Sequence, residues 1–467
     1  MNITFLIGNG FDINLGLKTR YIDFYRYYSA LSRDEDTDAI KKFKSEITRF
    51  IEDDTHKTEN AIDWRDLEVA LGKWTAKMKD DEVEPLYFNL IDNLRDYLTG
   101  EYRNFDTKAF DPQTFTSHLL DPVSKNFNRN RANEIRNYWN SNNGPDYLNI
   151  INFNYTLTLE QLLGFQGSVL ELGVNFAGRV TRLANIYHIH QTLNDEEILV
   201  GLNDASQIAN TDFHNDRHIC NLLIKPDTNA LLGTGINQDC ERVIATTHLF
   251  VLFGTSAGIT DRKWWKAICN RVRASNARLL LFVFGENRSH MNLRHDVMSE
   301  EAIRKLLASA GLEGESTFSA VYPNCHVCFK SGLFKLQANY NNAIPDTQTY
   351  KIGKTDVEVK VLDRGMRHLT LSVDAPSEET GVSAEAKWIK EFFPGYRETS
   401  QSIHHHKSGD ANLPYDRIVI DSENNHKELF FEISSFFGKS NRLPIHISPE
   451  LRAASLVDYV KNTLIKE

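Results

Sequence analysis

The first residues of the chain constrain its fold more than any other stretch. Ile3–Ile7 is a run of apolar and β-branched residues, which is typical of a short buried strand. Gly8-Asn9-Gly10 follows directly, and glycines after an apolar strand indicate a tight loop. In an α/β sheet such a loop lies at the carboxyl end of a strand, where ligands bind, and it often leads into a helix. Ile13 stands where the dinucleotide fingerprint has its third glycine, so the stretch alone fits both a nucleotide site and an ordinary strand end.

Length and charge set the class of protein and of partner. A chain of 467 residues exceeds one ordinary core, so we expect two or three domains. The formal net charge of −10 argues against a broad nucleic-acid-binding face. No apolar run approaches the roughly 18 residues that span a bilayer, the N-terminus lacks the features of a signal peptide, and five cysteines suggest a reducing compartment. We therefore predict a soluble cytoplasmic protein with neither a membrane nor nucleic acid as its partner.

Apolar runs alternate with helical patterns over the first 345 residues. The runs are continuous, which is typical of strands in a parallel sheet that helices cover on both faces. We therefore predict an α/β fold with a doubly wound, mainly parallel, Rossmann-like sheet and a large helical insertion at about residues 20–145. Three of the strands run into loops rich in Gly, Asn or Ser, which would share one carboxyl edge of the sheet. The predicted strands cover residues 3–7, 147–151, 184–190, 198–201, 249–253 and 278–285.

Residues 346–467 are predicted to form a separate small α+β domain. A polar stretch at about residues 340–349 has the composition of a linker. Beyond it, short segments alternate apolar and polar side chains with period two, as half-exposed antiparallel strands do. The predicted elements are strands at 356–361, 368–373 and 417–421 and a closing helix at 451–466.

Three patterns resemble parts of metal sites. Cys325 and Cys328 have the Cys-x-x-Cys spacing, but no second pair completes a zinc site, so we interpret them as core thiols on a strand. His404–His406 lies in a polar stretch and is interpreted as a solvated loop. His188 and His190 would share one face of a strand, but no nearby carboxylate completes an obvious ligand set. We therefore predict no metal site.

Five short motifs follow one another over about residues 1–335: Ile7–Asp12 with Gly16-Leu17, Trp64–Glu68, Asn152–Thr156, His188–Gln191 and Gly254–Ser256. In this order they resemble the bacterial abortive-infection AbiH family, which is itself related to sirtuin-like NAD-processing domains. The second motif is similar to the family's Trp-x-Asp-x-Glu element. The other four are similar to the sirtuin Gly-Ala-Gly loop, Thr-x-Asn-x-Asp segment, His-Gly segment and Gly-Thr-Ser loop. The resemblance does not extend to residues 346–467.

The resemblance implies a sirtuin-like core and roles for particular residues. Asn154 stands at the asparagine of its segment and His190 at the catalytic histidine, so these two are the candidate catalytic residues. Asn154 would orient ribose hydroxyls or a water, and His190 would act as the base at neutral pH. Backbone N–H groups and hydroxyls of the loops would hold the pyrophosphate. The candidate NAD-binding residues are Gly8, Asn9, Gly10, Asp12, Gly254, Thr255 and Ser256.

The function implied by the resemblance is anti-phage defence by an NAD-consuming hydrolase. It would cleave the nicotinamide–ribose bond when infection triggers it, and the trigger would be a phage-derived molecule or partner protein. Sirtuin-like defence proteins often assemble, so a homo-oligomer is compatible with the resemblance. The C-terminal domain is our candidate for trigger recognition or assembly.

Two rival hypotheses stay open. Thr156 replaces an aspartate of the sirtuin pattern, Gln191 a glycine and Asn9 an alanine. The departures at Thr156 and Gln191 favour a nucleotide-binding sensor or scaffold without catalysis. The other rival is a nuclease-like toxin in which Asp12, Glu68 and further carboxylates hold Mg²⁺, since magnesium prefers oxygen ligands. The sequence assigns no definite role to Asp12 or Glu68.

Overall fold

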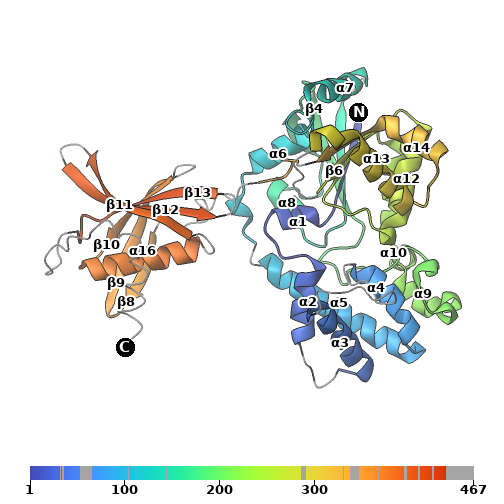
Figure 1. Cartoon of the computed structure of the whole chain (residues 1–467), viewed down its shortest axis with the longest axis horizontal. Coiled ribbons are helices and arrows are strands. Elements are labelled where there is room, and N and C mark those ends of the chain that lie inside the picture. The colour runs from blue at the N-terminus through green and yellow to red at the C-terminus, as the bar shows by residue number, and fades with distance from the viewer. Residues whose placement is uncertain are drawn as a thin grey trace. The chain divides into compact units, whose positions relative to one another are not determined.

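The structure is a computed structural model in which the chain forms two compact units, Met1–Ala338 (unit 1) and Asn339–Glu467 (unit 2) (Figure 1). Trp64 and Arg65, residues 340–346 of the expected linker, and the closing helix expected at 451–466 lie outside the described residues. The described residues are 1–31, 33, 36–52, 66–103, 105–142, 145–284, 291–329, 331–336, 347–364, 368–393, 397–408, 411–422 and 425–437.

Unit 1 contains a seven-stranded sheet with the strand order β3-β4-β2-β1-β5-β6-β7. Only β3 runs antiparallel to its neighbour, and every neighbouring pair from β4 to β7 is parallel. All five residues of β5 are buried, which is why such strands form unbroken apolar runs in the sequence. The predicted α/β class is confirmed. The strands are β1 (Asn2–Ile7), β2 (Asp146–Asn152), β3 (Leu170–Val174), β4 (Val180–His188), β5 (Leu249–Phe253), β6 (Arg278–Val283) and β7 (Cys325–Phe329).

The chain extends this sheet from β1 in two directions. It first adds β2 and β4 on one side of β1, and later adds β5, β6 and β7 on the other side. The direction therefore reverses between β1 and β5, where Ile7 lies opposite Phe253. In open α/β sheets ligands bind beyond the carboxyl ends of the strands at such a reversal. Because β4, β2, β1 and β5 are consecutive neighbours, the loops that follow them meet at one edge, as the sequence predicts.

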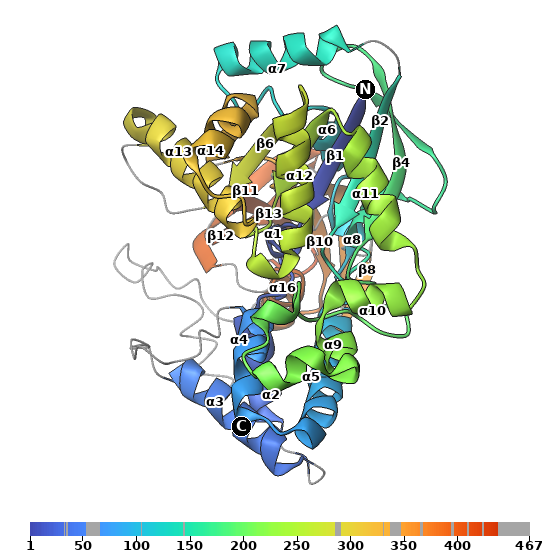
Figure 2. The same cartoon turned by 90° about the vertical axis from the view of Figure 1, so that its right-hand side faces the viewer.

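Helices pack on both faces of this sheet (Figure 2). Side chains of α1, α6, α7 and α8 form one core with Val251, and those of α11, α12, α13 and α14 form another core with Phe250. Adjacent residues of β5 thus face opposite cores, as the alternation along a strand requires. The bounds are α1 (Gly10–Asn14), α6 (Pro112–Leu120), α7 (Arg129–Ser141), α8 (Thr158–Leu163), α11 (Ile236–Thr246), α12 (Arg262–Ala274), α13 (Met291–Ser309) and α14 (Glu315–Val321).

The segment between β1 and β2 is largely helical, as predicted, and has a core of its own. Phe24, Tyr25 and Tyr28 of α2 are at most 1% exposed and lie in this core. No described helix has the length and apolar character that crossing a membrane requires. The helices around this core are α2 (Tyr21–Ala30), α3 (Asp38–Glu52), α4 (Leu67–Trp74), α5 (Asp80–Arg103), α9 (Arg217–Leu223) and α10 (Lys225–Leu231). Short 3-10 turns in unit 1 are η1 (Thr75–Lys77), η2 (Thr107–Ala109), η3 (Ala205–Gln207), η4 (Thr211–Asn215), η5 (Ile259–Asp261) and η6 (Tyr322–Asn324).

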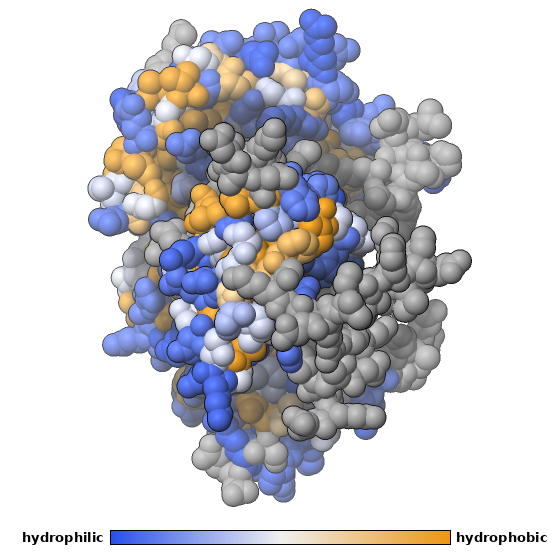
Figure 3. All heavy atoms as spheres, turned by 90° about the vertical axis from the view of Figure 1, so that its left-hand side faces the viewer, coloured by the Kyte–Doolittle hydropathy of each residue, from blue (hydrophilic) through white to orange (hydrophobic). Residues whose placement is uncertain are grey.

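The described residues of unit 2 form a six-stranded sheet, ordered β11-β12-β13-β10-β9-β8, against which one helix packs. The pair β10 and β13 is parallel and the other pairs are antiparallel. Trp388 of the helix is fully buried with its ring centroid 5.7 Å from that of Phe431. Figure 3 shows hydrophilic and hydrophobic residues interspersed on the visible surface. Leu362 and Ile403 are exposed apolar residues of unit 2. The elements are β8 (Thr347–Ile352), β9 (Thr355–Arg364), β10 (His368–Asp374), α16 (Glu378–Phe392), β11 (Arg397–Ser408), β12 (Ala411–Ser422) and β13 (Asn425–Glu432).

Four local predictions are wrong. The strand predicted at 184–190 ends at His188, so His190 lies beyond β4 and the two histidines do not share one strand face. Residues 198–201 form no strand, and the Gly201 N–H donates to a side chain, Oε1 of Glu68, at 3.0 Å. Residues 347–349 belong to β8 and not to a linker. His404–His406 lies in β11, where it pairs with β12. Strand pairing uses only the backbone, so exposed histidines such as His404 and His405 are compatible with it.

Candidate active site

The loops after β1 and β5 pack backbone against backbone. The Gly8 N–H donates to the Phe253 carbonyl at 2.9 Å, and the Gly10 N–H donates to the Gly254 carbonyl at 2.7 Å. A Cβ on Gly10 would lie 2.6 Å from Cα of Gly254, and Gly254 itself has φ +72°. Glycine is the residue that tolerates both a close backbone approach and a positive φ. The N–H groups of Gly8 and Gly10 are therefore engaged within the protein and do not face a ligand.

Three other N–H groups of these loops are free. Among the described residues, no hydrogen-bond partner lies against the backbone N–H of Asn9, Thr255 or Ser256. Asn9 and Ser256 are exposed and Thr255 is half-buried. Successive unpaired N–H groups in tight loops form concave anion sites. These three predicted residues, rather than the glycines beside them, could therefore bind a phosphate.

Asp12 joins the first loop to the loop after β2. Its carboxylate is buried and accepts hydrogen bonds from Thr156 Oγ1 at 2.6 Å and Thr158 Oγ1 at 2.8 Å. Burial raises the pKa of Asp12 to about 6, although the two hydroxyls act to lower it. An aspartate at position 156 would place a second carboxylate against the first, whereas threonine supplies a donor. The contact thus explains the departure of Thr156 from the sirtuin pattern, and it engages Asp12 within the protein.

Asn154 lies in the loop after β2 and is 4% exposed. Its Nδ2 donates to the Gly8 carbonyl at 3.3 Å, which places its side chain beside the first glycine loop. Its Oδ1 is buried and has no hydrogen-bond partner among the described residues. An unpaired buried amide oxygen costs about 1–3 kcal/mol, and such atoms in native proteins require an explanation such as a water or a ligand. Asn154 therefore has one acceptor available at this edge of the sheet.

His190 follows β4 by two residues and is 6% exposed. Its Nδ1 lies 3.2 Å from the Phe153 carbonyl oxygen and its Nε2 lies 3.0 Å from Oδ1 of Asp261. A carbonyl and a carboxylate only accept hydrogen bonds, so each ring nitrogen lies against an acceptor, and the tautomer decides which nitrogen donates. Both edges of the ring are thus occupied by groups of the protein.

His188, the last residue of β4, is held in a parallel way. Its Nδ1 lies 3.0 Å from the Asn154 carbonyl oxygen and its Nε2 lies 2.7 Å from Oε1 of Glu160. Burial alone would lower the pKa of His188, but the hydrogen bond and charge of Glu160 raise it above its ordinary value. The two histidines therefore attach the end of β4 to the loop after β2 through successive carbonyl groups.

Glu68, Lys225 and Asp261 form a buried line of charges, in which each group contacts the next and Asp261 contacts His190. Lys225 Nζ donates to Oδ1 of Asp261 at 2.9 Å and to the two carboxylate oxygens of Glu68 at 2.9 and 3.0 Å. Lys225 and Glu68 are each 5% exposed. Burial raises the pKa of Asp261, but the charges of Lys225 and His190 outweigh it and hold that pKa well below its usual range. Burial likewise lowers the pKa of Lys225, and the two carboxylates outweigh it and raise that pKa.

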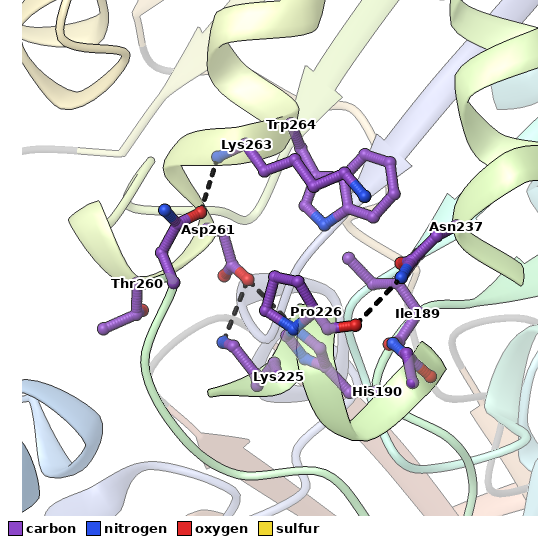
Figure 4. Close-up of a pocket in the computed structure, with 11 residues that line it drawn as sticks. Ile189, His190, Lys225, Pro226, Asn237, Thr260, Asp261, Lys263 and Trp264 are labelled. Carbon is purple, nitrogen blue, oxygen red and sulfur yellow. Dashed lines mark hydrogen bonds and ion pairs between the residues drawn. The ribbon is translucent and has the colours of Figure 1, made fainter. Parts of the chain in front are cut away.

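A small cavity adjoins these charges (Figure 4). Figure 4 shows Lys225 and His190 both directed at the Asp261 carboxylate. His190, Lys225, Asp261 and Asn237 are among the lining residues, and the cavity volume is about 10 Å³. That is roughly the space for one water molecule. The cavity beside His190 therefore admits a water but not a nucleotide, which would have to lie over the exposed loop residues.

The structure brings the predicted site residues to one sheet edge, although they do not share one cavity. Asn9, Thr255 and Ser256 lie on the β1 and β5 loops, Asn154 touches Gly8, and His190 faces the line of charges. Lys225 and Asp261 were missed by sequence analysis. Neither residue stands in a pattern that distinguishes it, whereas Glu68 was indicated by its motif.

Asp12 and Glu68 belong to separate contacts. Asp12 binds two threonine hydroxyls, and Glu68 binds a lysine and a backbone N–H. In the part of the chain that the structure describes, no three His, Cys, Asp or Glu side chains are grouped as metal ligands. Around Asp12, the described residues thus contain no group of three such ligands of the kind that would favour the nuclease hypothesis.

Gln191 allows a test of strain at the site. It follows His190 directly and has φ +63°, a conformation that costs a non-glycine residue about 1–2 kcal/mol. The similar sirtuin segment has glycine here. Gln191→Gly and Gln191→Ala both remove the 3.4 Å hydrogen bond to Asn229, but only glycine relieves the strain. We expect Gln191→Gly to be more stable than Gln191→Ala by about 1 kcal/mol in urea denaturation. Equal stability would show that position 191 is not strained.

Comparison with known proteins adds one finding. The family model described as bacteriophage abortive infection AbiH matches residues 4–283, which is more than half of the chain and contains every residue of the site described above. No curated protein matched the sequence.

Proposed function

The chain belongs to the bacteriophage abortive infection AbiH family, and from this premise we propose that it is a defence protein that hydrolyses NAD when infection triggers it. Its role in abortive infection follows from the family. The hydrolase activity, the Rossmann-like and sirtuin-like character of the core and the binding of NAD are our proposal. We also propose that the protein recognises a phage-derived trigger, either as a single chain or as a homo-oligomer.

One observation carries this proposal. The loops after β4, β2, β1 and β5 meet at one edge next to the reversal of strand order, which is where doubly wound sheets bind dinucleotides. The free N–H groups of Asn9, Thr255 and Ser256 suit a pyrophosphate. The unpaired Oδ1 of Asn154 suits a ribose hydroxyl. These groups support the proposal of a nucleotide site with a histidine beside it.

The proposed reaction is hydrolysis. The bond between ribose C1′ and the nicotinamide nitrogen breaks, and nicotinamide leaves with the bonding electron pair. Water adds to C1′, and its proton passes to a nitrogen of the His190 ring and then to solvent. Each ring nitrogen of His190 lies against a protein acceptor in this structure, so one contact must open before that nitrogen can meet the attacking water. That requirement suits an enzyme that is silent until triggered.

The test is release of nicotinamide from NAD by the purified full chain, measured by chromatography with and without lysate of phage-infected cells. We expect release in the presence of the lysate. Asn154→Ala and His190→Gln should each lower it by about 100-fold or more, the range in which general acid–base groups contribute.

His326→Gln is the matched control, because His326 is as buried as His190, at 6% exposed, but lies on β7. It should release nicotinamide at the wild-type rate. No release under either condition, or full release by a variant lacking both Asn154 and His190 side chains, would contradict the hydrolase proposal.

The second candidate is a nucleotide sensor that binds NAD without cleaving it. The enclosed His190 ring favours this alternative, since each of its nitrogens lies against a protein acceptor. A sensor would bind NAD in calorimetry, lose binding in Asn154→Ala, and release no nicotinamide with infected lysate.

A further inference from the structure

Lys225 is a buried cation beside the candidate base, and the proposed chemistry does not use it directly. Glu68, Lys225 and Asp261 come from three separate segments, α4, α10 and η5. Their contacts form one line that ends on Nε2 of His190. Buried ion pairs are often no more stabilising than apolar residues of similar size. Stability alone therefore gives no reason for placing these charges here.

We propose that Lys225 and Glu68 are positioning residues for His190. Lys225 holds the Asp261 carboxylate, which accepts from His190 and so sets the orientation of the ring. Glu68 accepts two hydrogen bonds from the Lys225 ammonium, so that Lys225 is shared between Glu68 and Asp261. The inference rests on the proposed hydrolase function, in which His190 accepts a proton.

The groups that face His190 come from several elements. Asp261 touches it, Lys225 and Glu68 follow in the line of contacts, and the Tyr155 ring centroid lies 6.1 Å from that of His190. Lys263, which lines the same cavity, is paired with Glu241 at 2.9 Å. Further ionisable groups around Glu68 are Asp66 at the N-cap of α4, Tyr21 of α2 and Tyr87 of α5.

The charges predict opposite effects for two substitutions. With both carboxylates ionised and Lys225 protonated, the three groups beside His190 have a net charge of minus one. Glu68→Gln makes this charge zero and Lys225→Met makes it minus two, whereas the double variant restores minus one. Negative charge nearby favours the protonated ring, which cannot act as a base. Loss of Glu68 should thus extend activity to lower pH, and loss of Lys225 should do the reverse.

The experiment is the pH–rate profile of nicotinamide release from NAD by the full chain in infected lysate. The acid limb is the range in which the rate falls as the pH is lowered. We expect it to move to lower pH by at least about half a pH unit in Glu68→Gln, and to higher pH by a similar amount in Lys225→Met. The double variant should lie near the wild type, and Lys225→Arg, which keeps the charge, should also remain near it. KM for NAD should change less than about threefold, because Glu68 and Lys225 act on His190 through Asp261 and are not among the proposed NAD-binding residues.

Lys44→Met is the matched control. Lys44 is 6% exposed and its Nζ lies 2.7 Å from Asp36, in the helical insertion. Its loss removes a buried lysine elsewhere and should leave the acid limb where the wild type has it. A shift as large as that of Lys225→Met would show that the limb reports general destabilisation, and would overturn the proposal.

A second readout does not depend on activity. Nitrogen NMR of ¹⁵N-histidine-labelled protein follows protonation of the His190 ring, whose signals are those missing from His190→Gln. The titration midpoint should move in opposite directions in Glu68→Gln and Lys225→Met and return in the double variant. If the titration midpoints move in these directions but no nicotinamide is released, only the proposal of hydrolase activity is refuted. Midpoints that stay fixed, or that move in the same direction, would refute the positioning role.

Discussion

Replacing Lys225 by methionine is expected to lower the free energy of unfolding by about 3–5 kcal/mol, the usual cost of removing one partner of a buried ion pair. The Lys225 ammonium donates to Glu68 and Asp261. Methionine fills a similar volume, but among the described residues it leaves the buried Glu68 carboxylate with only the Gly201 N–H as a donor. The loss should appear as a lower midpoint of urea unfolding with an unchanged slope.

The double variant Glu68→Gln/Lys225→Met separates charge from packing. It removes both members of the pair and leaves Asp261 in contact with His190. A neutral amide at position 68 can still accept from the Gly201 N–H. We therefore expect the double variant to be more stable than Lys225→Met alone by about 2 kcal/mol or more. If the double variant loses as much free energy of unfolding as the two single variants together, this explanation is contradicted.

Gly254→Ala is expected to destabilise the protein by about 2–4 kcal/mol, combining backbone strain with a clash. Gly254 has φ +72°, and a Cβ there would lie 2.8 Å from the backbone N of Phe11 and 2.9 Å from the Gly8 carbonyl oxygen. Both neighbours are backbone atoms, so neither can move by a side-chain rotation. The two loops would have to separate at the candidate site. Urea denaturation measures the loss.

Gly164→Ala is the control for the strain alone. Gly164 has φ +61°, and among the described residues no atom lies within 4 Å of the position that an alanine methyl group would take there. It should therefore cost about 1–2 kcal/mol, the strain without the clash. If Gly254→Ala costs no more than Gly164→Ala, the close packing of the β1 and β5 loops does not stabilise the protein.

The central strands β1 and β5 of unit 1 could be predicted because burial on both faces leaves a local signature, whereas β3 was not predicted. Ile3–Ile7 is a run of apolar and β-branched residues, residues 249–253 are an unbroken apolar run, and both segments are buried central strands in the structure. The same signature failed at residues 198–201. Ile198 and Val200 are buried in the core of the helical insertion without any strand pairing. Apolar composition reports burial, and it does not report which backbone groups are paired.

By itself, the sequence determined which residues stand at the ends of the apolar strands. Gly8, Asn154, His190 and Thr255 could be placed there because a strand and the loop after it are adjacent in the chain. Only the tertiary structure decided what these residues contact. It engages the Gly8 and Gly10 N–H groups, leaves those of Asn9, Thr255 and Ser256 free, and brings Lys225 to a glutamate 157 positions away. Such contacts depend on the path of the whole chain between the partners, and no local pattern of residue types encodes that path.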